Sequence, residues 1–475
     1  MSSKPALITD PDIILGYLTD ASNTHGRAEA LAVPADVDAL AATLRWAQDR
    51  GMPVTVTARR TGTTGAAVPD GGLLLSTERL SQVEAPDIVG GGALLGPHQD
   101  TLEAAGQHFP PDPTSRYECS VGGAIVCNAS GARSFRYGAT RGWIDWVDVV
   151  LPTGERLERV SRDTPLPAGW PRLRWAEPPV KTAAGYAPAD NLLDLLIGSE
   201  GTLGVITRAG LRLRPAPAGV LTMLAFFPDL ETTLRFVDQA RSGADRARAP
   251  RPKPGPLNPR AIEYFDPNAL EMIRARVDLP AGATDALLLE VEHEGEAPLD
   301  RWFEALVEGG ALAEHTVVAE DEQGQRRLAA IRHALPAGTN ERVVANRMPK
   351  VGTDFAVPDA ALAEMMAEYR AVTLPHVCFG HIGDNHLHLN LLPRDATELA
   401  EARSTYRRLA ERAVALGGTV SAEHGIGKLK RALLAHQVGP ETLGAFAALK
   451  AAADPAWILG RGTLLEPPPA PGGAV

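Results

Sequence analysis

Hydrophobic and polar positions in the first half of the chain recur with two different periods. In the segment 36–51, Leu40, Leu44 and Trp46 stand at near-helical spacing, and the PVTVTA that follows has the composition of a strand. The same reasoning predicts strands at WVDVVL and TLGVITRAGLRLRP and a helix at DNLLDLLIGSE. Long segments rich in Gly, Ser and Thr separate these elements, and long loops inside a domain usually line a ligand.

The second half of the chain alternates between strand and helix patterns. Strands are predicted at GVLTMLAFF, ALLLEVEHE and KVGTDFAVP, and helices at PDLETTLRFVDQA, APLDRWFEALVEG and PDAALAEMMAEYRAV. Pro215 and Pro217 mark a break between the halves. We therefore expect an α+β protein with an N-terminal extension at 1–29, domains at 30–216 and 217–466, and a flexible tail at 467–475. The Pro-rich ARAPRPKPGPLNPR is expected to be a surface loop.

Composition narrows the classes of function. The 475 residues are 44% hydrophobic and 22% charged, which is ordinary for a globular protein. The net charge of −11 is spread along the chain, which argues against nucleic-acid binding. Cys119, Cys127 and Cys378 lack the spacing of a disulfide framework, an iron–sulfur cluster or a thiolate zinc site. No stretch approaches the ~20 apolar residues of a membrane span. We expect a cytoplasmic protein, and peripheral docking to a membrane partner stays open.

Three Gly-rich runs offer backbone N–H groups with few side chains in the way. They are TGTTGAAVPDGG, SVGGAIVCNASG and IGSEGTLGVIT. Backbone N–H groups arranged in this way bind diphosphates. No run matches GxGxxG or GxxxxGK[ST], so neither a Rossmann dinucleotide fold nor a P-loop is indicated. Any one of them alone could be an ordinary turn-rich loop.

Their order along the chain carries more information. Together with YGATRGWIDWVDVVLPTG, the three runs closely resemble the two-part FAD-binding domain of the vanillyl-alcohol oxidase and p-cresol methylhydroxylase superfamily over most of residues 35–215. The resemblance implies bound FAD. It places the diphosphate at Thr61, Gly62, Thr63, Thr64, Gly65, Ser120, Val121, Gly122 and Gly123, the flavin side at Gly201, Thr202 and Ile206, and the isoalloxazine near Asn128 and Gly131.

One departure from that superfamily stands at the entry to the first run. Arg59 and Arg60 occupy positions where relatives usually carry Gly or Ala. Two arginines beside a diphosphate can pair with its oxygens. The other interpretation is a solvated surface turn, and both stay open.

Histidines cluster in the C-terminal half. HIGDNHLHLN holds His381, His386 and His388, and SAEHGIG holds His424. A single histidine is more often structural than a ligand. However, a hairpin turning at Asp384 and Asn385 would make His381 and His388 direct cross-strand neighbours with Cβ atoms about 5 Å apart, close enough to chelate one ion.

The carboxylate of Glu423 is the natural third ligand for such an ion. Zinc is the first expectation, and two histidines with one carboxylate also suit Fe(II) or Mn(II). A separate base of near-neutral pKa is needed if a hydroxyl is oxidised, because its proton must leave while the flavin takes the hydride. His424 is the candidate for this base.

The two histidine segments also resemble a known family. GHIGDNHLHLN and SAEHGIG match the GHxGDGNxH and EHGxG motifs of the FAD-linked oxidase C-terminal family, which includes D-lactate, glycolate and D-2-hydroxyglutarate dehydrogenases. The resemblance implies an antiparallel-sheet substrate domain and a small D-2-hydroxy acid substrate. It implies metal ligands at His381, His388 and Glu423, a base at His424 and a substrate contact at Asn390.

Two positions depart from the family motif. Asn385 and His386 stand where relatives usually have Gly and Asn. On the hairpin His386 shares a face with His388. It could therefore join the site, alter the metal or face solvent.

The substrate carboxylate requires a fixed cation. Arg332 and Lys350 are our candidates, since Arg offers a bidentate fork and Lys a point charge. Both positions loosely resemble the family's substrate-binding pair, and a surface salt bridge is the alternative. Arg461 is assigned no role.

We expect an FAD-dependent D-2-hydroxy acid dehydrogenase that passes electrons to an external quinone, cytochrome or electron-transfer flavoprotein. The alternatives are an oxygen-using flavin alcohol oxidase, a metal-dependent hydrolase and a non-catalytic flavin-binding subunit of a glycolate oxidase-like complex. A homodimer also stays open.

Overall fold

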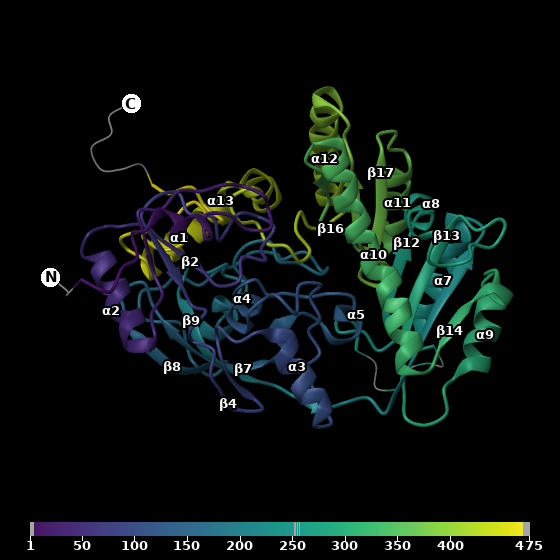
Figure 1. Ribbon diagram of the computed structural model, residues 1–475, viewed down its shortest axis with the longest axis horizontal. Helices are drawn as coiled ribbons and strands as arrows, with labels where there is room; N and C mark the ends of the chain where they lie inside the picture. Colours follow the sequence, from purple (N-terminus) through teal and green to yellow (C-terminus); the bar gives the residue numbers. More distant parts are fainter. Residues whose placement is uncertain (1–3, 251–252, 254, 256, 469–475) are drawn as a thin grey trace.

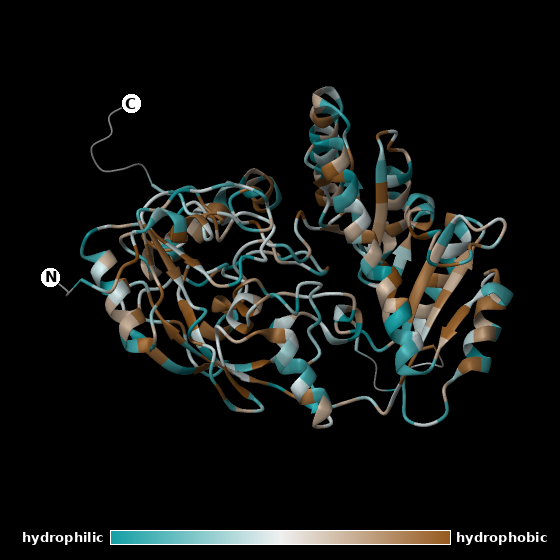
Figure 2. Ribbon diagram, in the orientation of Figure 1, coloured by the Kyte–Doolittle hydropathy of each residue, from teal (hydrophilic) through white to brown (hydrophobic). Residues whose placement is uncertain are grey.

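The computed structural model describes residues 4–250, 253, 255 and 257–468. It consists of two bodies that lie side by side, with the N-terminal half on the left of Figure 1 and most of the C-terminal half on the right. Apolar residues concentrate on the strands and on the inner sides of the helices (Figure 2). Most of the tail expected at 467–475, and part of the Pro-rich loop, lie outside the described residues.

The first body contains two main sheets, as expected for a two-part FAD-binding domain. A parallel sheet has the order β1-β3-β2, an antiparallel sheet has the order β4-β5-β9-β7-β8, and β6 pairs with β10. The strands are β1 (Ala30–Ala32), β2 (Val54–Thr57), β3 (Leu73–Ser76), β4 (Val83–Ala85), β5 (Ile88–Gly90), β6 (Gln107–His108), β7 (Ile144–Val150), β8 (Arg156–Ser161), β9 (Val205–Leu211) and β10 (Arg214–Pro215). The helices are α1 (Pro11–Leu15), α2 (Val37–Gln48), α3 (Leu95–Ala104), α4 (Val121–Val126), α5 (Ser134–Tyr137) and α6 (Leu192–Leu196).

Helix α2 illustrates how local sequence determines these elements. Asp36 caps its N-terminus by accepting a 2.8 Å hydrogen bond from the backbone N–H of Ala39. Leu40, Leu44 and Trp46 on one side of the helix are buried in a cluster with Val54 and other residues of the parallel sheet. The predicted helix and strand are both present.

The second body is built on one antiparallel sheet with the order β14-β11-β13-β12-β17-β18-β15, and β16 also pairs with β18. The strands are β11 (Gly219–Phe227), β12 (Pro259–Phe265), β13 (Asp285–His293), β14 (Val317–Ala319), β15 (Val351–Gly352), β16 (Phe355–Ala356), β17 (His376–His381) and β18 (His386–Leu391). The helices are α7 (Leu230–Gly243), α8 (Pro267–Ile273), α9 (Leu299–Glu308), α10 (Glu322–Asn346), α11 (Leu362–Arg370) and α12 (Ala396–Ala415).

Both faces of this sheet are buried, which explains the nearly continuous apolar run of β11. Met223 and Ala225 belong to the large core cluster that also contains residues of α7 and α9. Their neighbours Leu224 and Phe226 belong to a separate cluster with residues of α8 and α10. Successive side chains of a strand point to opposite faces, so a strand covered on both sides is apolar throughout.

The strand expected at KVGTDFAVP is interrupted. Instead of one strand, the structure has the short β15 and β16, which both pair with β18. Between them the carboxylate of Asp354 is completely buried and accepts backbone N–H groups of Glu423 and His424. The backbone carbonyl of Asp354 also accepts the N–H of Ala422, so this residue pairs with the loop that carries Glu423 and His424 instead of with β18.

The end of the chain returns to the first body. Helix α13 (Arg431–Ala453) lies with the first body in Figure 1, and the ring of its Phe446 packs against that of Tyr186 with centroids 5.3 Å apart. Leu459 forms a parallel bridge with Val54, and Lys450 Nζ donates a 2.6 Å hydrogen bond to the carbonyl of Thr202. We expected these residues to belong to the second domain, but they pack on the first body.

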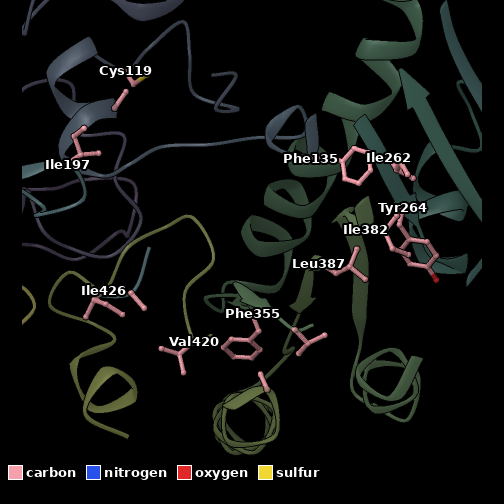
Figure 3. Close-up of a cluster of buried hydrophobic side chains, with 14 of the residues drawn as sticks. Cys119, Phe135, Ile197, Ile262, Tyr264, Phe355, Ile382, Leu387, Val420 and Ile426 are labelled. Carbon is pink, nitrogen blue, oxygen red and sulfur yellow. The ribbon is translucent and has the colours of Figure 1, made fainter. Parts of the chain in front are cut away.

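The two bodies share part of one core. In Figure 3, Phe135 of α5 lies beside Ile262 of β12, so a helix of the first body packs on the sheet of the second. An ion pair of 3.0 Å between Arg133 and Glu290 crosses the same contact. No helix in the described ranges has the length and apolar composition to span a membrane.

Candidate active site and metal centre

The three Gly-rich runs converge on one cavity of about 540 Å³. Residues from all three of them form its wall, and so do Arg59, Arg60, Glu423 and His424. The members that we predicted as cofactor contacts are Thr61, Gly62, Thr63, Ser120, Gly122, Gly123, Gly201 and Ile206. The volume is within the range typical of ligand sites.

The wall has the features that a diphosphate cofactor requires. A Cβ added at Gly62 would have no neighbour closer than 3.8 Å, and one at Gly201, which has a φ of +71°, would have none within 4 Å. The backbone is therefore open to the cavity at both glycines. Thr57 Oγ1, also in the wall, is buried and has no hydrogen-bond partner within the part of the chain that the structure describes. Arg59 and Arg60 supply positive charge, so the residues fit FAD.

Six residues with predicted cofactor roles do not line this cavity. Thr64 lies behind the wall, where its carbonyl accepts the backbone N–H of Lys428. Asn128 Oδ1 accepts the backbone N–H of Arg141 at 2.9 Å. The other four are Gly65, Val121, Gly131 and Thr202. Their cofactor roles stay predictions.

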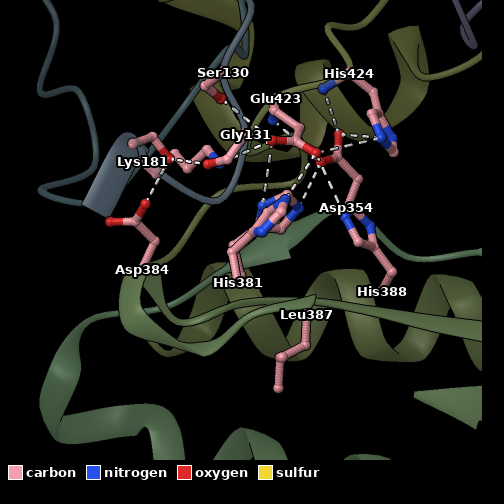
Figure 4. A network of polar contacts seen from close by, with 12 residues as sticks. Ser130, Gly131, Lys181, Asp354, His381, Asp384, Leu387, His388, Glu423 and His424 are labelled. Carbon is pink, nitrogen blue, oxygen red and sulfur yellow. Dashed lines mark hydrogen bonds and ion pairs between the residues drawn. The ribbon is translucent and has the colours of Figure 1, made fainter. Parts of the chain in front are cut away.

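A second group of side chains lies next to the cavity. His381 at the end of β17, His386 and His388 on β18, and Glu423 in the loop after α12 each offer one ligand atom, all within 4.8 Å of one another. Nε2 of His381 and Nε2 of His388 are 3.5 and 3.4 Å from Glu423 Oε1 (Figure 4). Two aromatic nitrogens and one carboxylate oxygen therefore converge, as a divalent metal requires.

The predicted register of the hairpin is wrong. His381 lies opposite His386, and His388 lies opposite Phe379. The turn is longer than expected because it contains a short 3₁₀ helix, Ile382–Asp384, and Asn385 in a left-handed conformation with φ of +56°. His388 nevertheless lies on the same face of the sheet as His386 and His381, since it is two residues from His386 and His386 is opposite His381.

Tertiary contacts hold this longer turn. Arg241 of α7 donates hydrogen bonds to the carbonyl of Ile382 and to the side chain of Asn385. Asp384 accepts a 2.7 Å hydrogen bond from Ser134 Oγ of the first body. The register therefore depends on residues far away in the sequence.

Residues outside the ligand group, which we call outer partners, contact the converging ligands and orient them. His381 Nδ1 is 2.5 Å from Glu263 Oε1, which directs Nε2 toward Glu423. The other oxygen of Glu423, Oε2, accepts hydrogen bonds from Lys181 Nζ at 2.8 Å and from Ser130 Oγ at 3.3 Å. Such partners fix ring orientation in metal sites. The sequence contained no signal for Glu263, Lys181 or Ser130, because none lies near the histidine motifs.

Charge determines the protonation of these groups. Burial opposes ionisation of Glu423, but Lys181 and His381 hold its pKa well below the usual range. Burial also opposes protonation of His381, yet Glu263 and Glu423 raise its pKa to about 9. Glu423 is therefore a carboxylate, as a ligand must be, whereas His381 is protonated near pH 7 and would release this proton on binding a metal.

His424 is not one of the four converging ligands, although its Nε2 lies 3.8 Å from Glu423 Oε1. Its ring is stacked on His388, and its Nδ1 is 3.6 Å from Asp354 Oδ2. It lines the cavity, and its side chain is 34% exposed. Burial lowers its pKa to about 4, below the near-neutral value expected for the base, so the imidazole is neutral near pH 7 but only weakly basic.

The three residues predicted to contact the substrate are not gathered in one group as the converging ligands are. Arg332 Nε donates a 2.7 Å hydrogen bond to Glu263 Oε2, and its side chain is 19% exposed. Lys350 is exposed and has no ion-pair partner among the described residues. Asn390 is buried on β18 and donates a 3.1 Å hydrogen bond to the carbonyl of His388. Their roles toward substrate stay predictions.

Two protein-family profiles match most of this chain. One protein-family profile, described as FAD binding domain, matches residues 28–159, and another, described as FAD linked oxidases, C-terminal domain, matches residues 216–464. The chain belongs to the family of FAD-linked oxidases. The predicted family resemblance and FAD-binding domain are confirmed, and the hydrolase alternative loses its support.

Several relatives match nearly the whole length of this chain. A D-2-hydroxyglutarate dehydrogenase of Xanthomonas citri is 30% identical over 93% of this chain and 90% of that protein. Glycolate oxidase subunit GlcD of Bacillus subtilis is 28% identical over 92% and 88%. A D-lactate dehydrogenase of Anaerostipes hadrus is 27% identical over 98% and 95%. The expectation of an FAD-dependent oxidoreductase is confirmed.

A solved structure of an alkyldihydroxyacetonephosphate synthase shares the fold of this chain. It superposes with a TM-score of 0.66 over 96% of this chain and 81% of that chain, at 16% sequence identity. The predicted fold class, with an FAD-binding domain followed by an antiparallel α+β domain, is confirmed.

Proposed function

We propose that this protein oxidises a small D-2-hydroxy acid to the 2-oxo acid and passes the electrons to an external acceptor. The observation that carries the proposal is the position of two consecutive residues, Glu423 and His424. Glu423 belongs to the converging ligand group, and both residues line the cavity that fits FAD. A substrate bound there would contact the metal site and the cofactor together.

Each component has a separate task. When bound, FAD accepts the hydride from the substrate Cα, and a divalent metal lowers the pKa of the substrate hydroxyl. His424 is neutral and faces the cavity, so it can take up the hydroxyl proton. Lys181 and Ser130 hold Glu423 Oε2, which leaves Oε1 directed at His381 and His388.

The carboxylate of the acid distinguishes it from a simple alcohol. Arg332 lies within the network of outer partners through Glu263, and Lys350 precedes β15, which pairs with β18 beside Asn390. We assign these two cations to the substrate carboxylate and Asn390 to orienting the substrate. The names of the relatives, which act on D-lactate, D-2-hydroxyglutarate or glycolate, support this class.

A panel of acids tests this proposal. The FAD-loaded protein is mixed with D- and L-lactate, glycolate, D- and L-2-hydroxyglutarate and larger 2-hydroxy acids in the presence of a redox dye. We expect dye reduction with one or more D-acids or glycolate and slower reduction with L-acids. Dye reduction by simple alcohols alone would contradict the substrate class. Oxygen consumption at the rate of dye reduction would favour the oxidase alternative.

A further inference from the structure

The imidazole of His386 is enclosed at the centre of the histidine group. It is completely buried, and its ring centroid is 5.3 Å from that of His381 and 4.5 Å from that of His388. The observed register produces this placement, because His386 lies directly opposite His381 and on the same face as His388. The related motif has Asn at this position.

The two ring nitrogens of His386 have different environments. Nε2 lies 2.9 Å from Asp354 Oδ1, an ion-pair contact whose geometry does not form a hydrogen bond. Nδ1 has no hydrogen-bond partner among the described residues, and the nearest carboxylate oxygen, Glu423 Oε2, is 3.9 Å away. A fully buried ring nitrogen without a partner is costly, and a bound ion would satisfy it.

Each of the three histidines has one nitrogen close to an oxygen outside the group, through a hydrogen bond for His381 and His388 and through an ion-pair contact for His386. One nitrogen of His381 faces Glu263, one nitrogen of His388 faces the carbonyl of Thr353 at 3.2 Å, and one nitrogen of His386 faces Asp354. In each ring the other nitrogen is left for the centre of the group. Metal-bound histidines have this arrangement, because the outer acceptor fixes both tautomer and orientation.

Asp354 is suited to this outer role. Its carboxylate is completely buried and accepts a 2.6 Å hydrogen bond from Lys430 Nζ and 3.1 Å hydrogen bonds from the backbone N–H groups of Glu423 and His424. It therefore connects His386 to the loop that carries the proposed carboxylate ligand and base. A histidine that merely filled the core would not require this buried, charged partner.

We infer that His386 is a fourth protein ligand, so that this chain holds its metal with three imidazoles and one carboxylate. The inference rests on the proposed function, in which the other three residues bind a divalent ion. Four protein donors complete a tetrahedral zinc site, and a catalytic zinc site keeps one position open. A substrate oxygen would therefore need a fifth or sixth position. The donor set thus favours an ion that accepts more than four ligands, such as Mn(II) or Fe(II).

Metal affinity tests this inference. The FAD-loaded protein is loaded with Co(II), and the dissociation constant is measured by competition with a chelator. His386→Asn introduces the residue of the related motif, and we expect it to weaken Co(II) binding at least tenfold. His315→Asn, which alters a half-exposed histidine, should leave the affinity unchanged. Equal affinity of the His386→Asn variant and the wild type would overturn the inference.

X-ray absorption at the cobalt edge of the wild-type protein provides a measurement that needs no variant. Three imidazoles in the coordination shell, falling to two in His386→Asn, is the expected result. Two imidazoles in the wild type would overturn the fourth ligand and leave the three-ligand site of the proposed function intact. No bound cobalt at all would overturn both, so the two failures are distinguishable.

Discussion

The ring of His424 is stacked on the ring of His388, with centroids 5.2 Å apart and planes 12° from parallel. His388 offers a ligand atom to the converging group, and His424 does not. His424 instead lines the cavity that fits FAD. The stack therefore holds the candidate base between the metal site and the cofactor site.

This separation predicts the effect of His424→Ala. We expect the rate of flavin reduction by the substrate to fall about 10²- to 10⁴-fold, because the hydroxyl proton loses its acceptor. The metal content should not change, because His424 is not among the ligands. Stopped-flow absorbance and metal analysis of the same sample check both. Loss of the metal together with the rate would instead make His424 a ligand.

Lys181→Met tests how Glu423 is held. Without the ammonium group at 2.8 Å, Oε2 of Glu423 loses its charged partner, and the carboxylate is free to rotate. We expect metal affinity to fall roughly 10- to 100-fold, with FAD content unchanged. Chelator competition measures the affinity, and Lys4→Met on the surface serves as control. Unchanged affinity would show that Lys181 does not position the ligand.

Gly62→Val tests the cofactor cavity. The new side chain would have room in the fold, since a Cβ at Gly62 has no neighbour closer than 3.8 Å, but it would project into the cavity. We expect the FAD content of the purified protein to fall severalfold while the apoprotein keeps its thermal midpoint. Gly295→Val, at an exposed position with no neighbour within 4 Å, is the matched control. A full complement of FAD in Gly62→Val would place the cofactor elsewhere.

The raised pKa of Glu200 predicts that the stability of the folded protein depends on pH. Burial raises the pKa of this carboxyl to about 7, although it accepts backbone N–H groups of Ile426 and Gly427. The folded state therefore favours the protonated form. Its stabilising contribution is complete below the unfolded pKa of 4.5 and is lost as the pH rises through about 7. Each unit of pKa difference corresponds to about 1.4 kcal/mol.

Glu200→Gln removes this titration. Between pH 5 and pH 8 the thermal midpoint of the wild type should fall relative to that of Glu200→Gln, measured with FAD in constant excess. Differential scanning calorimetry at several pH values checks the difference. Parallel pH profiles for the two proteins would mean that Glu200 does not titrate in this window.

Local patterns predicted much of the fold. The apolar stripe of α2, the apolar run of β11 and the three Gly-rich runs all determine structure through neighbouring residues, and the structure agrees with each of them. The motifs also indicated which histidines converge. In each case the information lies within a short stretch of chain.

The remaining features depend on residues far apart in sequence. The hairpin register follows from Arg241 and Ser134 holding the turn, and the burial of His386 follows from that register. Lys181 approaches Glu423 only because the two bodies meet. The return of α13 to the first body rests on contacts such as the bridge between Val54 and Leu459. No local period or spacing encodes such contacts.

An anaerobic titration of the flavin tests the central claim most directly. The FAD-loaded protein is examined in its native form, after exhaustive removal of divalent metal, and after the metal is restored, with D-2-hydroxy acids added to each sample. We predict that at least one acid bleaches the oxidised flavin band of the native protein, that metal removal abolishes the bleaching, and that restored metal recovers it. Absence of bleaching with every acid, or undiminished bleaching without metal, would contradict the account.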